Sequence, residues 1–418
     1  MARWRRVGAL GSAATMVGAA TVAVNGLAYL VPVAAARLLL PSDLGVLASL
    51  LAILAVTAVV GLGLQTALAV RWARQEAVAG AGRVSLATAV ITTAALILAA
   101  PGLAAVLDLP VYQPLLVAAM TFPVVLAGRW LGELQGRQRY GRLAAGMVML
   151  GLARYGGLLA ALWAGQGVTI SLVAGTAGAA LAVAALPLLC KDKHAAAITA
   201  PESISARDVI RASSATTAML AVSYADVILA RAVLPAAEAG AYAVGSVLTR
   251  GALWAPGVLT VLALPLFARG QRNAVRVTLA GVAATGAILV VIAAIAGDLA
   301  VRLAGGEEYV RLGDSAAAFA AIGALYALVF VVVNAEIAAG SPRPAMVLWL
   351  ALGTLVAIGA LQRPSTVDAV LALALTTAAA SALAMGTVYA VRRRRQAPTT
   401  TPPAGMSTVA SSTPVGNA

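Results

Sequence analysis

The sequence contains one cysteine and one histidine among 418 residues, so side chains that often bind metals or form cross-links are nearly absent. A lone cysteine excludes a disulfide framework and a cysteine-rich metal site. Cys190 lies at the end of a predicted helix, where a small apolar filler is the simplest role, and His194 follows in a polar loop. We interpret His194 as a solvated loop residue, with a proton carrier as the alternative.

Enzyme signatures are missing as well. The sequence has no GxxxxGK[ST] phosphate loop, which excludes ATP hydrolysis by this chain, and it has no HExxH zinc motif. The predicted outer loops are short, whereas a membrane glycosyltransferase or ligase needs a larger loop that carries its acid or base. We therefore expect a protein that is not an enzyme and that has no catalytic residue, metal or cofactor.

Charge is scarce, and long apolar runs fill the sequence. Only 11% of the residues are charged, 61% are hydrophobic and the mean hydropathy is +0.95, which excludes a soluble domain of this size. A helix needs roughly 20 apolar residues to cross a bilayer. The predicted spans are residues 8–36, 44–70, 84–107, 112–134, 143–164, 168–189, 208–234, 238–265, 275–301, 313–338, 345–361 and 367–391.

Arginine and lysine gather in every second gap between these spans. Such gaps hold most of the 29 basic residues, including Arg3, Arg5 and Arg6 before the first span and Arg392–Arg395 after the last. Because basic residues concentrate on the cytoplasmic side, we expect a multi-pass protein of the cell membrane with both termini in the cytoplasm. The net charge of +14 then reflects topology, so the expected partners are anionic membrane lipids rather than nucleic acid.

The two halves of the chain carry the same pattern, about 195 residues apart. In residues 37–45 (RLLLPSDLG) and 231–240 (RAVLPAAEAG), an arginine ends one span, a proline stops the helix and an acid opens the next span. Each copy holds six predicted spans, so both cross the membrane in the same sense, as in transporters built from parallel repeats. We expect an N-terminal lobe at 1–190, a cytoplasmic linker at 191–207, a C-terminal lobe at 208–391 and a disordered cytoplasmic tail at 392–418.

Three groups of short motifs follow one another over most of residues 10–390. They are AAARLLLPSDLG at 34–45 with GLQTA at 63–67 and Arg74; GELQGRQRY at 132–140 with GLAR at 151–154; and ADVILAR at 225–231 with GAYA at 240–243 and Pro265. Their order and spacing resemble the polysaccharide-biosynthesis, Wzx-type oligosaccharide flippases. The resemblance implies the multidrug/oligosaccharidyl-lipid/polysaccharide exporter superfamily. The expected fold is an all-α integral membrane protein with about twelve transmembrane helices in two pseudo-symmetric six-helix lobes around a central cavity.

Two arginines fall deep inside predicted spans, one in each half. Arg154 in the fifth span and Arg250 in the eighth lie roughly 15–18 Å from the outer helix ends, at 1.5 Å per residue. A charge inside the bilayer costs about 2.5–3.5 kcal/mol on insertion scales, which makes such residues candidates for function. Two guanidiniums that line one cavity would suit a diphosphate.

An acid at similar depth leaves two further interpretations open. Asp226 lies in the seventh span, which forms a hairpin with the eighth, so an Asp226–Arg250 ion pair is the first alternative. The second is that Asp226 binds a coupling proton or sodium ion. The sequence does not decide between pairing and cation binding.

Four other polar residues complete the predicted site. Asn25 and Gln65 are expected to line the cavity, with hydrogen bonds between helices as the alternative. Arg37 and Arg231 lie at outer helix ends, where we expect contact with phosphate or lipid, or simple snorkelling.

These features together predict a flippase that carries a polyprenyl-diphosphate-linked oligosaccharide across the cytoplasmic membrane by alternating access, for polysaccharide biosynthesis. The expected partners are the lipid-linked glycan, membrane lipids and glycan-assembly proteins. A cation-coupled multidrug exporter of the same superfamily and a non-transporting membrane scaffold are the alternatives. The glycan, the driving ion and the oligomeric state stay open.

Overall fold

The structure is a computed structural model that describes residues 2–73, 80–191, 206–268, 272–338 and 345–395, and these residues form helices joined by short connections. The helices are α1 (Ala2–Leu38), α2 (Pro41–Ala73), α3 (Ala81–Leu107), α4 (Tyr112–Gly136), α5 (Tyr140–Trp163), α6 (Val168–Cys190), α7 (Ala206–Val233), α8 (Ala236–Ala268), α9 (Arg272–Ile295), α10 (Gly297–Gly305), the 3-10 helix η1 (Glu307–Ser315), α11 (Ala316–Ala338), α12 (Met346–Gln362) and α13 (Val367–Arg395).

The predicted spans fall on helices, so the predicted all-α membrane fold is confirmed. Within the described residues, ten helical stretches are long and apolar enough to cross a membrane, and α12 is a shorter apolar helix of 17 residues. The eighth predicted span lies within α8, which has 33 residues. Backbone hydrogen bonding explains the uniform choice of helix, because in hydrocarbon a helix satisfies its own N–H and C=O groups.

One predicted boundary is wrong. The ninth span was expected to run to residue 301, but α9 ends at Ile295 and the separate nine-residue helix α10 follows. Ala296 leaves helical geometry, and Gly297 with Asp298 then starts a new helix with an acid in its first turn. Gly306, with a φ of 101°, ends α10 in a conformation that favours glycine, and η1 follows it.

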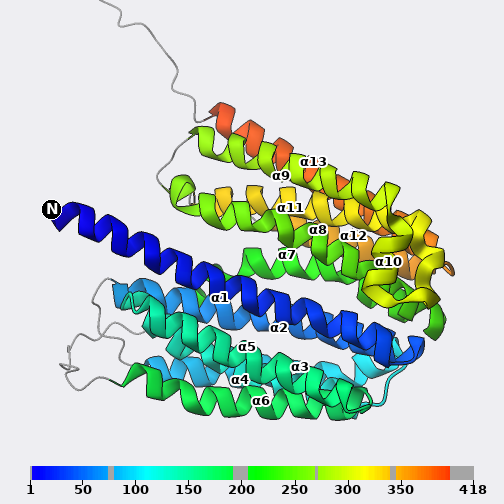
Figure 1. Ribbon diagram of the computed structural model, residues 1–418, viewed down its shortest axis with the longest axis horizontal. Helices are drawn as coiled ribbons and strands as arrows, with labels where there is room; N and C mark the ends of the chain where they lie inside the picture. Colours follow the sequence, from blue (N-terminus) through cyan, green and yellow to red (C-terminus); the bar gives the residue numbers. More distant parts are fainter. Residues whose placement is uncertain (1, 74–79, 192–205, 269–271, 339–344, 396–418) are drawn as a thin grey trace, which may run out of the picture.

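The helices form two groups, α1–α6 and α7–α13, that lie side by side (Figure 1). Equivalent pairs pack together in both groups: α2 on α4 as α8 on α11, α3 on α4 as α9 on α11, and α4 on α6 as α11 on α13. The spatial arrangement therefore repeats the pattern found in the two halves of the sequence. We refer to the groups as the N-group and the C-group.

The start of α1 and the end of α13 lie at the same end of the bundle (Figure 1). We call this the terminal end, and we call the opposite end, which carries the α1–α2 and α7–α8 connections, the far end. The predicted linker and tail lie almost entirely outside the described residues, so the predicted domain limits stay predictions, as does the cytoplasmic side of the membrane.

Helix α2 makes most of the contacts between the two groups, against α7 and α8. At the far end, α2 and α8 meet through glycines: a Cβ on Gly45 would lie 3.1 Å from the backbone nitrogen of Gly240. A Cβ on Gly240 would in turn overlap the backbone carbonyl of Pro41. Small residues permit this close approach, which is how helices associate where lipid removes the hydrophobic driving force.

The outward surfaces of the bundle are apolar. Leu98, Ile295 and Leu361 are more than four-fifths exposed, as suits side chains that face hydrocarbon. Inside the N-group, by contrast, glycines on α4 contact the backbone of α2. A Cβ on Gly132 would lie 2.6 Å from the carbonyl oxygen of Gln65 and 2.9 Å from the Cβ of Leu68.

We predict that Gly132→Ala lowers the stability of the purified protein by about 1–3 kcal/mol, because the added methyl overpacks the α2–α4 contact. The measurement is the melting temperature in detergent. The matched control is Gly386→Ala in α13, where a Cβ meets nothing within 4 Å. Equal melting temperatures for Gly132→Ala and the wild type would contradict the packing described for α2 and α4.

Candidate functional site

Three charged residues are buried among those that the structure describes: Asp226, Arg250 and Glu336. Glu336, near the terminal end of α11, accepts a hydrogen bond from Arg392 of α13, and this pair ties the two helices together. Asp226 and Arg250 lie in the interior of α7 and α8, well away from that pair. They form the centre of the candidate site.

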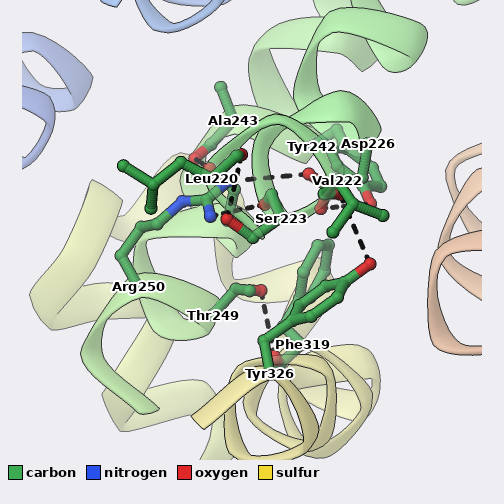
Figure 2. A network of polar contacts seen from close by, with 11 residues as sticks. Leu220, Val222, Ser223, Asp226, Tyr242, Ala243, Thr249, Arg250, Phe319 and Tyr326 are labelled. Carbon is green, nitrogen blue, oxygen red and sulfur yellow. Dashed lines mark hydrogen bonds and ion pairs between the residues drawn. The ribbon is translucent and has the colours of Figure 1, made fainter. Parts of the chain in front are cut away.

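The Asp226–Arg250 pair joins the two helices of one hairpin (Figure 2). Arg250 Nη2 lies 3.5 Å from Asp226 Oδ1, and Arg250 Nη1 donates a hydrogen bond of 2.5 Å to the carbonyl oxygen of Ser223. The guanidinium also stacks over the ring of Tyr224, 3.6 Å from its centroid. The ion pair that the sequence left as an alternative is therefore present.

Tyrosine hydroxyls extend this pair into a network that includes α11 (Figure 2). Tyr242 of α8 donates a hydrogen bond of 3.1 Å to Asp226 Oδ2, and Tyr326 of α11 donates one of 3.3 Å to the carbonyl oxygen of Val222. Asp226 Oδ1 and Arg250 Nη2 themselves have no hydrogen-bond partner and interact only as charges. The network compensates Asp226 from two sides, by a hydrogen bond to Oδ2 and by the charge of Arg250 next to Oδ1.

Arg154 is in a different electrostatic situation. It lies on α5 of the N-group, nine residues before the helix end at Trp163 and hence about 14 Å deep. Its guanidinium stacks on the ring of Tyr155, 4.1 Å from the centroid, and donates a hydrogen bond to the Tyr155 hydroxyl. Its Nε is buried without a hydrogen-bond partner, and no carboxylate of the described residues pairs with it. Arg154 therefore carries a charge that its own protein neighbours do not neutralise.

Each of the two arginines stacks on a tyrosine of its own group. Arg154 stacks on Tyr155 in the N-group, and Arg250 stacks on Tyr224 in the C-group. The groups touch beside Arg250, where a Cβ on Gly251 of α8 would lie 3.4 Å from the hydroxyl of Tyr29 on α1. We call the two arginines with Tyr155 and Tyr224 the arginine–tyrosine site.

The predicted polar residues of the N-group lie elsewhere. Asn25 is exposed on α1, and Gln65 of α2 donates a hydrogen bond of 2.8 Å to Gln135 Oε1 of α4. For Gln65, the interhelical hydrogen bond that the sequence left as an alternative is present. Whether either residue also lines a cavity stays a prediction.

The two arginines at the far end make reciprocal contacts between the groups. Arg37, at the end of α1, donates a hydrogen bond of 2.7 Å to the carbonyl oxygen of Leu303 in α10. Arg231, near the end of α7, donates to the carbonyl oxygens of Leu107 and Asp108 at the end of α3, at 3.0 and 3.1 Å. The last carbonyls of a helix lack intrahelical donors and carry the negative end of its dipole, so both arginines act as C-terminal caps. Their predicted phosphate contacts stay predictions.

Neither of two pockets lined by described residues contains Arg154 or Arg250. One lies between α2, α3, α7 and α12, and the other between α4 and α6. Among the described residues, no three histidines, cysteines or carboxylates cluster in a way that would hold a metal ion. His194 lies outside the described residues.

Sequence reasoning missed the tyrosines of the site. Only 5% of the residues are aromatic, yet Tyr155 directly follows Arg154, and Tyr224 precedes Asp226 by two residues. An aromatic residue beside a charge inside an apolar span is the one signal in the sequence. It does not identify the tyrosines by itself, because the face that a helix turns to its neighbours cannot be read from spans of nearly uniform hydropathy.

Comparison with known structures shows that the helices of this chain have a recognised fold. The chain resembles a eukaryotic MATE transporter, AtDTX14, with a TM-score of 0.63 at 15% identity over 92% of this chain and 97% of that one. It also resembles an inward-facing multidrug resistance MATE family transporter of the MOP superfamily, with a TM-score of 0.63 at 14% identity over 90% and 96% of the two chains. The fold is that of the MATE transporters.

A third structure with this MATE fold is a MOP superfamily transporter from Pyrococcus furiosus, described as having a binding pocket of reverse polarity that suggests a different function. It matches with a TM-score of 0.57 at 12% identity, over 91% of this chain and 95% of that one. No protein-family profile and no curated protein matches the sequence. At these identities the likeness shows the fold alone, and it confirms the expected all-α architecture.

We predict that Asp226→Asn destabilises the protein by about 3–5 kcal/mol, because it leaves the buried charge of Arg250 without its counter-ion. The double variant Asp226→Asn/Arg250→Gln should recover much of this loss, and melting temperatures of the single and double variants measure the coupling. The control is Glu238→Gln, which breaks an exposed pair with Arg311 and should cost less than about 1 kcal/mol. A single variant as stable as the wild type would show that the pair is not formed.

Proposed function

We propose that this chain is a membrane transporter that moves a polyprenyl-diphosphate-linked oligosaccharide across the cytoplasmic membrane by alternating access, and that it works with glycan-assembly proteins. The observation that carries the proposal is Arg154: a cation at mid-depth, stacked on Tyr155, with a buried Nε that has no partner. A cation inside the membrane costs about 2.5–3.5 kcal/mol, and an anionic cargo would offset that cost when it binds.

The charge balance inside the bundle favours an anionic cargo. The carboxylates in the interior of the described helices already have cationic partners: Asp226 with Arg250, Glu133 with Arg137, and Glu336 with Arg392. Arg154, by contrast, has no carboxylate partner among the described residues, and its Nε has no hydrogen-bond partner. A guanidinium presents paired N–H donors that match phosphate oxygens, so a diphosphate is the chemical group that fits it best.

Arg250 has a different role in this proposal. Because Asp226 offsets its charge, Arg250 holds Tyr224 in place by stacking. The diphosphate then binds Arg154 first, with the ring of Tyr155 beside it. Arg250 joins the diphosphate only if its contact with Asp226 loosens, and its Nη2 has no hydrogen-bond partner that would prevent this.

In this proposal, the far end of the bundle opens and closes during the alternating-access cycle. The caps from Arg37 and Arg231 connect the N-group and the C-group, and the glycine contact of α2 with α8 closes the same end. With the terminal end in the cytoplasm, as the distribution of basic residues predicts, this is the arrangement closed to the outside. Opening the far end would break both caps.

A cation-coupled multidrug exporter is the second candidate, because Asp226 is a buried acid with one oxygen free of hydrogen bonds. Protonation or cation binding at that oxygen would release Arg250. Two of the similar structures are MATE transporters, one of them described as a multidrug resistance protein. If this candidate is right, cells that lack the protein should be more sensitive to cationic drugs. The flippase proposal does not require that result.

We predict that Arg154→Gln lowers transport of a fluorescent polyprenyl-diphosphate oligosaccharide at least tenfold in proteoliposomes, because the diphosphate loses a cation that no carboxylate of the described residues compensates. Arg154→Lys should keep part of the activity, since it retains the charge but not the planar fork. In cells that lack the wild-type chain, Arg154→Gln should let the lipid-linked intermediate accumulate.

The matched control is Arg311→Gln, which removes an exposed arginine at the far end without touching the arginine–tyrosine site. Normal transport by Arg154→Gln at normal protein abundance would refute the flippase proposal. Loss of drug efflux with unchanged glycan export would support the multidrug exporter in its place.

We also predict that the double variant Arg37→Ala/Arg231→Ala opens the far end. It removes three hydrogen bonds between the groups, each worth about 0.5–1.5 kcal/mol net, so the open population should rise by about tenfold or more. Spin labels at the exposed residues Val111 and Leu361, in a Cys190→Ala background, would report the distance between the groups.

Arg302→Ala serves as the control for these labels, since Arg302 pairs with Glu307 inside the C-group. An unchanged distance distribution in the double variant would show that the two caps do not hold the far end closed.

A further inference from the structure

The pocket between α2, α3, α7 and α12 has a volume of about 780 Å³ and is lined by both groups of helices. We call it the lateral groove. Its lining on α7 runs from Ala221 to Val233, which corresponds to about 18 Å along the helix axis. On α12 it runs from Leu352 to Ala360, and Arg363 just after the helix completes the lining. The groove therefore begins near mid-depth and ends at the far end of the bundle.

The wall of the lateral groove is apolar along its length. Small side chains such as Ala225, Ala232 and Ala360 form its hollow, and valine, leucine and isoleucine form its sides. Thr57 is the one uncharged polar residue of the lining, and its hydroxyl is already engaged by carbonyls of its own helix and by Thr121. A polar ligand would find no partner in this part of the groove, whereas a hydrocarbon chain needs none.

One cation stands at the mouth of the groove. Arg363 follows the last residue of α12 and is exposed, and no carboxylate of the described residues pairs with it. Its backbone has φ 44° and ψ 62°, a left-handed conformation in which helices usually place glycine. An arginine in that conformation is strained, and strain of this kind is often found at residues that bind a ligand.

We propose that the lateral groove binds an acyl chain of an anionic phospholipid from the leaflet at the far end, with the phosphate on Arg363. The chain fits the long apolar wall, and the charged head group fits the cation at the mouth. The bilayer itself is the source, because its phospholipids greatly outnumber any lipid-linked cargo and occupy the site by mass action. This inference does not depend on the proposed cargo.

The bound lipid acts on the arrangement of the two groups. Since α2 and α3 form one wall and α7 and α12 the other, movement of one group against the other changes the shape of the groove. A ligand stabilises the arrangement to which it binds best. Anionic phospholipid in the groove therefore favours the arrangement seen here, in which the far end is closed.

The test uses the full-length protein, purified with its lipid removed and then titrated with phosphatidylglycerol or phosphatidylcholine. Native mass spectrometry counts bound lipid, and the melting temperature reports stabilisation. We expect wild-type protein to retain phosphatidylglycerol about fivefold more tightly than phosphatidylcholine, the effect of one arginine at an anionic lipid head group. Arg363→Gln should abolish this preference, while Arg302→Gln, at the same end, should leave it unchanged.

Two further variants separate lipid binding from folding. Ala360 is exposed to the membrane, so Ala360→Trp fills the groove without disturbing the core and should reduce binding of both lipids. Arg363→Gly relieves the backbone strain, so it should raise the melting temperature in lipid-free detergent and yet lose the stabilisation by phosphatidylglycerol.

The same measurements can overturn the proposal. Equal retention of the two lipids by wild-type protein, or unchanged preference in both Ala360→Trp and Arg363→Gln, would place the lipid elsewhere. Stronger stabilisation by a polyprenyl phosphate than by phosphatidylglycerol, lost in Ala360→Trp, would assign the groove to the chain of the cargo instead.

Discussion

The requirement that a charge in hydrocarbon has a partner governs the interior of this protein. Asp226 and Arg250 meet it by pairing with each other, and Tyr242 supplies a further hydrogen bond to the acid. The pair holds α7 against α8, and the surrounding hydroxyls bring in α11. Water is absent from the membrane interior, so these contacts are stronger there than the same contacts would be on a soluble surface.

Among the described residues, Arg154 is an exception to this rule. Its neighbours provide an aromatic face and a hydroxyl but no negative charge. The stacked arrangement keeps the guanidinium plane in a defined orientation, which a flexible ammonium group would lack. The C-group thus holds a buried ion pair, whereas the arginine of the N-group has no carboxylate partner among the described residues.

Sequence reasoning recovered the architecture because the strongest physical constraint, the length of an apolar helix, is visible in the sequence. The repeat at Arg37 and Arg231 was visible too, since both residues end a helix before a proline. Their acceptors were not visible: the carbonyls of Leu303 and Leu107 belong to the other group, and backbone groups carry no sequence signal. The break after Ile295 was missed for a similar reason, because residues 296–301 are as apolar as a span and only Gly297 and Asp298 mark a new start.

The number of residues from a helix end gives the depth of a side chain in the membrane, but it does not identify the neighbours of that side chain. The order of the spans puts Arg250 and Asp226 in one hairpin, and it leaves a diphosphate site, an ion pair and a cation site as possible interpretations. Only the positions of the side chains show the pair. Gln65 is a similar case, since its partner Gln135 lies 70 residues away on α4.

The crossed contacts of Arg37 and Arg231 also bear on the history of the chain. Each arginine belongs to one half and each acceptor to the other, which is the relation that a twofold axis imposes on two copies of one subunit. In a homodimer of six-helix subunits, a single substitution to arginine would create both contacts at once, one from each subunit. Fusion of two copies of the gene would then keep the two arginines as separate residues that can diverge. Each half of the present chain would still bind the other through its arginine.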